Sequence, residues 1–438
     1  MIEQNNNLDN AVAQNNSKSN ISIYRIIAKI TFVIFLFFTF FGTSLPFKDE
    51  VRDIDQIGTS NIINQIVYSL LFLLSCIALI PKRKNIILLI KNDKFLSLFL
   101  FWCLLSILWS DYSFVSFKRL FQIFTTVMVS LAILLHTNSS DTIMKYFKYI
   151  FLLYIIITIP SILIIPGAKD QFGQWRGLAT HKNMFGQICL INILIWFYVF
   201  RYGKLITKIY SAIMLVISII FLFGSYSATS IITFFILLFI GILLSIDYLF
   251  KKLCIGRSFS LLVMLSCLMI LFITYYMAPD ITESLPDYIG KDNTLSSRTE
   301  LWNDMLLEVK KNYLIGCGFA GFWVIDNVNL LLLYETYNWL PNQAHNGYLD
   351  ILNETGLIGL LIFTAMIIFY FINLIKLKKP HYWKWFIIAT LILNLQESTL
   401  FKQGITMNMM FIFSYLLLCT KLIYQNHNPK DQTGITQA

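Results

Sequence analysis

The sequence predicts an all-α polytopic membrane protein with about twelve transmembrane helices and a long external loop that contains amphipathic helices. The composition is the first reason: 57% of the 438 residues are hydrophobic and 13% are charged, unlike a soluble globular protein. The second is that apolar runs of about 18 residues or more recur, and each can cross roughly 30 Å of hydrocarbon. Strands of a membrane barrel would alternate polar and apolar residues, so the spanning elements are helices.

In order along the chain, residues 1–25 are rich in Asn and Gln and are predicted to be a disordered cytoplasmic amino terminus. Residues 26–277 hold spans one to nine, 278–346 a large external loop, 347–424 spans ten to twelve, and 425–438 a cytoplasmic tail. The spans are expected at about 26–45, 62–80, 95–110, a fourth that opens at Lys118, 149–166, 184–201, 206–224, 228–249, 258–277, 347–375, 384–400 and 404–424.

The basic residues set the orientation. Lys and Arg concentrate in short loops such as PKRKN, RYGKLITK, KKLCIGR and KLKKPHYWK, and such loops stay in the cytoplasm. Both termini are therefore predicted to be cytoplasmic, and the 278–346 loop external. Because this rule also accounts for the net charge of +10, no nucleic-acid partner is expected.

Several kinds of chemistry find no support in the sequence. The seven cysteines show no C-x-x-C spacing, and no metal-ligand pattern is present. A Walker loop, a D-x-D motif and a G-x-S-x-G elbow are also absent. We therefore expect no bound metal and no cofactor.

The external loop contains the most informative stretch, from NTLSSRTELWNDMLLEVKKNYLIGCGFAGFW to PNQAHNGYLDILNETGLIGL. Ser297 and Glu300 have the spacing of a capping box that starts a helix. Apolar residues then recur at helical spacing: Leu301, Trp302, Met305, Leu306 and Val309. This helix is expected to lie on the outer leaflet or to pack over the bundle, and Gly316 and Gly318 to end it.

Two residues of this loop are candidates for phosphate and proton chemistry. Arg298 is expected in the first turn of the helix, where a guanidinium and the helix terminus both favour an anion; the alternative is a salt bridge to a nearby carboxylate. His345 directly precedes a long apolar helix, where it would meet a headgroup at the membrane surface. It could act as a general base, or cap the helix.

A second polar group lies at the entrance of the sixth span. It consists of Arg176, His181, Lys182 and Asn183, all candidate substrate-binding residues. Arg176 and Lys182 could hold a diphosphate and His181 could orient a sugar, or the group could be a polar belt that faces lipid. Lys118 and Arg119 open the fourth span on the outer side, either snorkelling to headgroups or contributing to an anion site.

Glu397 is placed near the outer end of span eleven, where an acid needs a partner. An arginine or a sugar hydroxyl could pair with it.

These motifs resemble a known family. SRTELW, YLIGCGFAGFW and QAHNGYLDILNETGLIGL resemble the O-antigen ligase and polymerase superfamily, and GLATHKNMFGQ is similar to its exopolysaccharide and capsule polymerases. LWSDYS and QES add minor agreement. The resemblance covers roughly residues 100–400, and the HNGYLD segment is its most specific part.

The resemblance implies a metal-independent glycosyltransferase of the bacterial inner membrane with its catalytic elements in the periplasmic loop. The implied partners are an undecaprenyl diphosphate-linked oligosaccharide donor, a glycan acceptor and the lipid bilayer, with a chain-length regulator as a further candidate. Carried over, His345 matches the family's proposed base, with Asn346 beside it as a substrate-binding residue, and Arg298 matches the diphosphate-binding arginine. The segment 181–183 matches the polymerase-type motif.

The chain departs from the family in one place. The turn SYSATS, residues 225–230, lacks an arginine that relatives often carry, so Arg176, Lys182 or Arg119 would have to replace it. The sequence-based hypothesis is a polymerase of lipid-linked repeat units. The alternatives are a ligase that transfers glycan to lipid A–core, a protein O-oligosaccharyltransferase, and a lipid-linked glycan flippase.

Overall fold

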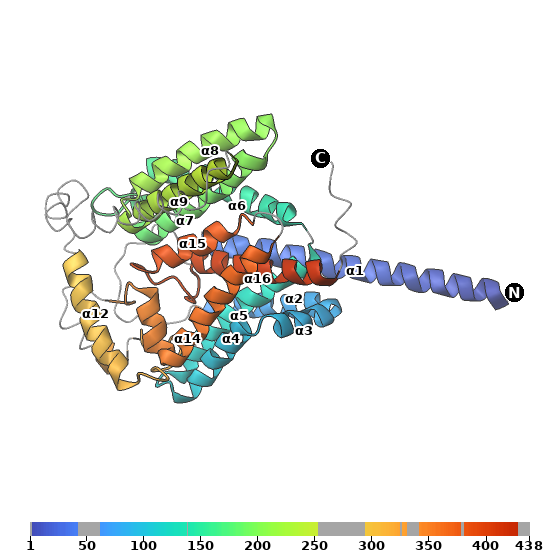
Figure 1. The fold of residues 1–438 in the computed structure, drawn as a ribbon, viewed down its shortest axis with the longest axis horizontal. Coiled ribbons are helices and arrows are strands. Elements are labelled where there is room, and N and C mark those ends of the chain that lie inside the picture. Colours follow the sequence, from blue (N-terminus) through green and yellow to red (C-terminus); the bar gives the residue numbers. More distant parts are fainter. Residues whose placement is uncertain are drawn as a thin grey trace.

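A computed structural model describes residues 2–42, 62–137, 139–252, 294–324, 326–330, 341–377 and 381–427. The chain is an all-α polytopic membrane protein (Figure 1). Within the described ranges nine helices are long and apolar enough to cross a membrane. They are α1 (Ile2–Phe41, apolar from Ser22), α2 (Ile62–Leu79) with α3 (Arg83–Asn92), α5 (Ser113–His136), α6 (Ser140–Ile164), α7 (Lys182–Tyr202), α8 (Leu205–Gly224), α9 (Ala228–Lys252), α14 (Gly347–Lys376) and α16 (Thr406–His427).

The carboxyl-terminal helix α16 is the most enclosed of these spans. It packs against α3, α5, α7, α14 and α15. At its centre the ring of Phe413 lies 5.1 Å from that of Trp383, 5.5 Å from Phe147 and 5.7 Å from Phe32. By contrast α8 exposes a row of large apolar side chains, as a surface in contact with lipid would. The core therefore lies around α16, and α8 lies at the periphery.

Two of the expected spans are shorter than the sequence suggests. The expected span at 95–110 is α4 (Phe95–Ser106), which a 3-10 turn extends to Trp109. The expected span at 384–400 is only α15 (Lys384–Leu393). Ten residues of helix reach about 15 Å, half of the roughly 30 Å of hydrocarbon, so α15 cannot cross alone. The expected span at 258–277 lies outside the described residues.

Two segments expected to be irregular are helical. The helix α1 begins at Ile2, so residues predicted to be disordered continue the first span, and Figure 1 shows this part projecting from the bundle. Extending an existing helix costs less than nucleating one, which composition alone does not reveal. The basic loop after α2 is also largely helical, because α3 begins at Arg83.

A helix from the loop that we expect to be external covers one end of the bundle. Figure 1 shows α12 (Thr294–Lys311) lying across the end opposite the start of α1; we call this the α12 end. Leu301, Met305 and Val309 are buried where α12 packs against α14. Of the two expected placements, α12 therefore packs over the bundle. It begins three residues before the predicted capping residue Ser297.

The helix α14 is broken at Gly356. This residue has φ 68° and ψ −175°, a conformation that is essentially restricted to glycine. The segment Leu357–Lys376 is about 30 Å long at 1.5 Å per residue, enough to cross the hydrocarbon. The segment Gly347–Thr355 therefore bends away at the α12 end, where Figure 1 shows it as a separate short helix.

The loop after α12 fills this break. A broken helix leaves carbonyl and N–H groups that must find partners, most of all near lipid. The loop supplies four backbone hydrogen bonds, Cys317 N–H to Asn353 O (2.9 Å), Gly318 N–H to Glu354 O (3.0 Å), Leu357 N–H to Tyr313 O (2.9 Å) and Ile358 N–H to Leu314 O (3.2 Å). The indole of Trp102 on α4 donates to the carbonyl of Thr355 at 2.9 Å. The loop and the break are thus one structural unit.

Candidate active site

One buried carboxylate gathers polar side chains from three other parts of the chain at the α12 end. Glu397 is 3% exposed. Its Oε1 accepts a hydrogen bond from Nδ2 of Asn183 at 3.0 Å and lies 3.5 Å from Nη2 of Arg298. Its Oε2 lies 3.6 Å from Nδ1 of His345. We call these four residues the Glu397 cluster. All four are site residues predicted from the sequence, and the fold brings them together.

The turn after α15 holds Glu397 in place. The side chain of Asn394 organises this turn, because its Oδ1 accepts backbone hydrogen bonds from Thr399 at 2.9 Å and Leu400 at 3.0 Å. The first N–H of α14, at Gly347, lies 2.9 Å from the carbonyl oxygen of Asn394 and 3.1 Å from that of Glu397. A Cβ at Gly347 would lie 2.0 Å from Oδ1 of Asn394, so only glycine fits here.

His345 lies on a strained backbone directly before α14. Its φ of 51° is in the left-handed region, which residues with a side chain seldom adopt. The preceding Ala344 is held from two sides, since its carbonyl accepts from Nε1 of Trp302 at 2.8 Å and its N–H donates to Oδ1 of Asp350 at 3.3 Å. The His345 side chain is 16% exposed and so reaches the surface. Strain that the surroundings maintain is frequent at functional sites.

The geometry around His345 suits a general base. Its Nδ1 faces Oε2 of Glu397 and also lies 3.3 Å from Nε2 of Gln343. Nε2 is the basic nitrogen in the tautomer that carries its proton on Nδ1, toward Glu397, and in that tautomer the amide oxygen of Gln343 rather than its Nε2 faces the ring. A carboxylate behind a histidine fixes the tautomer and stabilises the imidazolium that forms when the ring accepts a proton. The arrangement can therefore remove a proton from a hydroxyl group.

Arg298 forms the salt bridge that the sequence left open as its alternative role. Besides the contact with Glu397, its Nη1 donates to the carbonyl of Gln396 at 3.1 Å. The prediction that Arg298 lies in the first turn of its helix is wrong, because α12 begins at Thr294 and Arg298 is in the second turn. The free N–H groups of the helix terminus are thus not at its position. The phosphate-binding role stays a prediction.

The start of α7 contributes Asn183 to the cluster. His181 is the N-cap of α7, and its Nδ1 accepts from the backbone N–H of Asn183 at 3.2 Å. Lys182 is the first residue of the helix, next to the Asn183 amide that bonds to Glu397. Within this motif His181 shapes the helix start, and Asn183 reaches the carboxylate.

Arg119 is held away from the cluster by the loop. Its Nη1 donates to the carbonyl of Ala320 at 2.6 Å and its Nη2 to that of Trp323 at 3.0 Å. Buried carbonyls need donors, and the planar guanidinium can supply two at once. Arg119 thus positions the loop, and its role in binding a diphosphate stays a prediction.

Two further predicted residues have local roles. Arg176 is 4% exposed, and its Nε donates to the carbonyl of Gly167 at 2.6 Å, which ties together the loop between α6 and α7. Asn346 caps α14, because its Oδ1 accepts from the N–H groups of Tyr348 and Leu349. Neither contact depends on a substrate.

A buried charge network next to the cluster was not among the predicted site residues. Nζ of Lys402 lies 2.8 Å from Oε1 of Glu354 and 3.3 Å from Oδ2 of Asp350. The same carboxylates also accept from the loop, Glu354 from the N–H of Ala320 at 3.0 Å and Asp350 from Nε1 of Trp323 at 2.8 Å. Burial alone would lower the pKa of Lys402, but the two carboxylates outweigh it and raise that pKa. The sequence did contain a signal for this network. Asp350 and Glu354 lie one helical turn apart where a span was expected to begin, and two acids in such a place are costly without a cation.

The turn that lacks the family's arginine packs tightly against α7. A Cβ at Gly186 would come within 2.6 Å of the side chain of Ser227 and 2.9 Å of that of Ser230, so small residues are needed on both sides. Tyr226, at the tip, is 48% exposed with φ 50°. The close packing accounts for the small residues of this turn.

Two comparisons find known proteins that are similar to parts of the chain. The sequence profile of the O-antigen ligase family matches residues 213–364, which include Arg298 and His345 but neither Asn183 nor Glu397. Over this part, the chain is similar to the O-antigen ligase/polymerase superfamily. It is also 33% identical over 91 residues to the exopolysaccharide production protein ExoQ of Rhizobium meliloti (strain 1021). That match covers 20% of this chain and 21% of the relative. The resemblance seen in the sequence is confirmed.

Proposed function

We propose that this protein polymerises undecaprenyl diphosphate-linked oligosaccharide repeat units into a surface polysaccharide on the periplasmic face of the bacterial inner membrane. The observation that carries the proposal is the Glu397 cluster, in which a histidine, an arginine and an amide converge on one buried carboxylate. Its place at the α12 end, the external side by the distribution of basic loops, is where a lipid-linked sugar leaves the bilayer.

In this reaction Nε2 of His345 takes the proton of an acceptor hydroxyl while Glu397 stabilises the imidazolium. The hydroxyl oxygen then attacks the anomeric carbon of the donor. The bond between that carbon and the diphosphate oxygen breaks, so inversion at the carbon is expected, and undecaprenyl diphosphate leaves with its charge. Because diphosphate is already a good leaving group, its stabilisation by cations matters more than acid catalysis. Arg298 and Lys182 are the cations that we assign to it.

The choice of polymerase over ligase rests on the relatives. The likeness to an exopolysaccharide production protein favours chain growth, in which the donor's own kind is the acceptor. The matched family is described as O-antigen ligase, so transfer of finished glycan to lipid A–core is the second candidate.

Reconstitution in liposomes with a single lipid-linked repeat unit and no other acceptor distinguishes the two. We expect a ladder of longer lipid-linked glycans, since only a polymerase can use its donor as acceptor. Product that forms only after lipid A–core is added would make the protein a ligase. No product in either case, with the repeat unit crossing the bilayer, would refute the enzyme and support a flippase.

Variants of the cluster test the mechanism in the same assay. His345→Ala removes the base, so turnover should fall by about 10²–10⁴-fold while donor binding is largely retained. Glu397→Gln keeps the shape but removes the charge, so turnover should fall and Arg298 should lose its ion pair. Asn303→Ala, an exposed change on the same α12, is the control. Near-normal activity of His345→Ala would show that the base assignment is wrong.

A further inference from the structure

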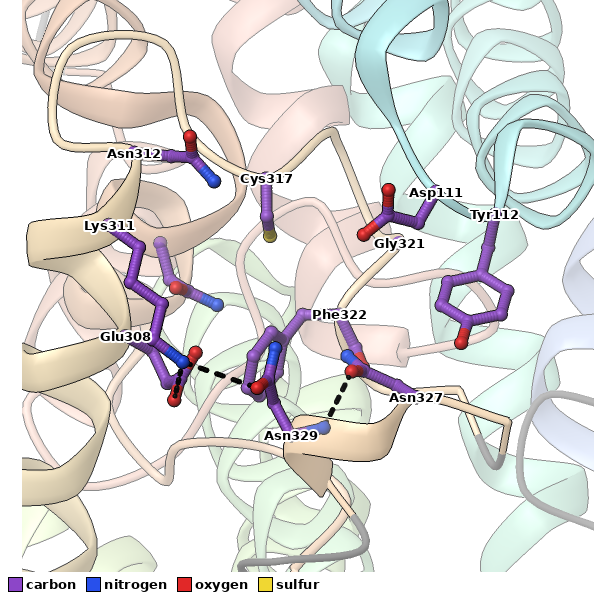
Figure 2. A pocket seen from close by; sticks show the side chains of 11 residues that line it. Asp111, Tyr112, Glu308, Lys311, Asn312, Cys317, Gly321, Phe322, Asn327 and Asn329 are labelled. Atoms are coloured by element: carbon purple, nitrogen blue, oxygen red, sulfur yellow. Dashed lines mark hydrogen bonds and ion pairs between the residues drawn. The ribbon is translucent and has the colours of Figure 1, made fainter.

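A polar pocket lies at the α12 end, at the opposite end of α12 from the Glu397 cluster. Figure 2 shows Asp111 and Tyr112, from the turn between α4 and α5, on one side of it and Glu308 and Lys311, from the last turns of α12, on the other. Asn312 and Cys317 of the following loop lie above, and Asn329 lies below. Carboxylates, amides and a phenol thus face one opening from separate elements of the chain.

One side chain in this pocket points to a ligand. Asn353, on the first segment of α14, lines the pocket and is 3% exposed. Its Nδ2 has no hydrogen-bond partner among the residues that the structure describes. An amide left unpaired away from water costs free energy, so buried amide groups normally have partners. A ligand that fills the pocket and accepts a hydrogen bond would satisfy this one.

The charges of the pocket select the class of ligand. Two carboxylates, Asp111 and Glu308, face one ammonium, Lys311, which is already bound at 2.7 Å to Glu308 and at 3.2 Å to Asn329. This lining disfavours a phosphate or a diphosphate. Carboxylates accept hydrogen bonds from hydroxyl groups, amides both donate and accept, and an aromatic ring such as that of Tyr112 packs on apolar faces. A neutral sugar offers hydroxyl groups and an apolar face together.

The distance between the pocket and the Glu397 cluster matches the length of a short glycan. Along α12 the distance from Arg298 to Glu308 is about 15 Å, and along α14 that from Gly347 to Asn353 is about 9 Å, at 1.5 Å per residue. The reacting sugar at His345 cannot extend so far. A glycan of a few sugars can reach from the cluster to the pocket, along the surface formed by α12 and α14.

We infer that this pocket binds uncharged sugar residues of the glycan at a distance from the bond being formed, so that it is a second carbohydrate subsite of the protein. The inference rests on the proposed function for the identity of the glycan, but the pocket binds through its own side chains and takes no part in the chemical step. Such a subsite would retain a growing chain between successive transfers.

The test is direct binding, which does not require turnover. The probe is a repeat-unit oligosaccharide released by mild acid from the organism's own surface polysaccharide, with neither lipid nor phosphate, titrated into the full-length protein in lipid nanodiscs. Asp111→Ala/Asn312→Ala changes two exposed residues of the pocket, and Asn353→Ala removes the unpaired amide. Asn303→Ala, exposed on α12 but outside the pocket, is the matched control.

We expect the wild-type protein and Asn303→Ala to bind the probe equally, and both sets of pocket variants to bind it at least about tenfold more weakly. Three outcomes would overturn the inference: no binding by the wild type, unchanged binding by the double variant, or displacement of the probe by inorganic diphosphate. If the probe binds through the pocket but no ladder forms, the proposed polymerase fails and the subsite stands. If a ladder forms but the pocket variants bind the probe as the wild type does, the proposed polymerase stands and the subsite fails.

Discussion

The break in α14 gives the sharpest test of how the α12 end is built. Gly356 combines a φ of 68° with a ψ of −175°. An added Cβ would lie 2.3 Å from the carbonyl oxygen of Leu314 and 2.5 Å from the nitrogen of Ile315, both backbone atoms. A side chain cannot turn aside here, so in Gly356→Ala the loop has to move. That movement would disrupt the backbone hydrogen bonds between the loop and α14.

The size of the effect follows from two contributions. The backbone conformation alone costs a residue with a side chain about 1–3 kcal/mol. The four displaced hydrogen bonds contribute about 0.5–1.5 kcal/mol each. We therefore expect Gly356→Ala to lower the free energy of unfolding by about 3–9 kcal/mol. Gly173→Ala is the matched control, because Gly173 has φ 78° but nothing lies within 4 Å of its added Cβ. Gly173→Ala should lower the unfolding free energy only by the conformational contribution of about 1–3 kcal/mol.

Unfolding by SDS titration in mixed micelles, followed by tryptophan fluorescence, would measure both variants. Two indoles report on the junction, since Trp102 donates to the carbonyl of Thr355 at 2.9 Å and Trp109 to that of Gly316 at 3.1 Å. The fluorescence of these two indoles should change at a lower SDS fraction in Gly356→Ala than in Gly173→Ala. Equal stability of Gly356→Ala and Gly173→Ala would refute the reasoning, because the steric contribution would then be absent.

Three further predictions concern charges around the site and at the opposite end. Lys402→Met leaves the carboxylates of Asp350 and Glu354 buried without a cation, so the unfolding free energy should fall by about 3–5 kcal/mol. Lys402→Arg, which keeps a cation there, is the control. A smaller loss of unfolding free energy in Lys402→Met than in Lys402→Arg would contradict this prediction. Stability should also fall with pH below 6.5, because burial and neighbouring lysines lower the pKa of His381 to about 3. The unfolded state then binds the proton first, which gives about 1.4 kcal/mol per pH unit between these values. His381→Phe should flatten that slope in denaturant titrations, and an unchanged slope would exclude His381 as its source. Arg119→Lys keeps the charge but loses the fork that holds two loop carbonyls, so kcat for the proposed polymerisation should fall with little change in KM. An unchanged kcat would show that the loop does not need this residue.

The sequence predicted the type of fold because a membrane imposes simple rules. Apolar runs of sufficient length must form spans whose backbone groups are satisfied within a helix, and nine such helices appear in the described residues. It also predicted the candidate residues Arg298, His345, Asn183 and Glu397, since polar residues at the ends of spans are costly unless they have partners or a function. The amphipathic face of α12 followed from helical spacing in the same way.

Local patterns failed where a neighbour far along the chain decides the outcome. Arg119 was expected either to snorkel to headgroups or to contribute to an anion site, whereas its guanidinium donates to carbonyls some two hundred residues later. The expected span at 384–400 ends at Leu393 because Asn394 and the start of α14 fix a turn there.

By itself, then, the sequence determined that the chain spans the membrane, which superfamily it resembles and which polar residues are costly enough to need an explanation. Only the tertiary structure decided that Glu397 pairs with Arg298, His345 and Asn183, that Lys402 neutralises two acids of α14, and that an unpaired amide lines a separate pocket. The physical reason is the distance along the chain over which each interaction acts. Hydropathy and helix periodicity act over neighbouring residues, whereas a buried charge finds its partner through space, across distances along the chain that no local pattern records.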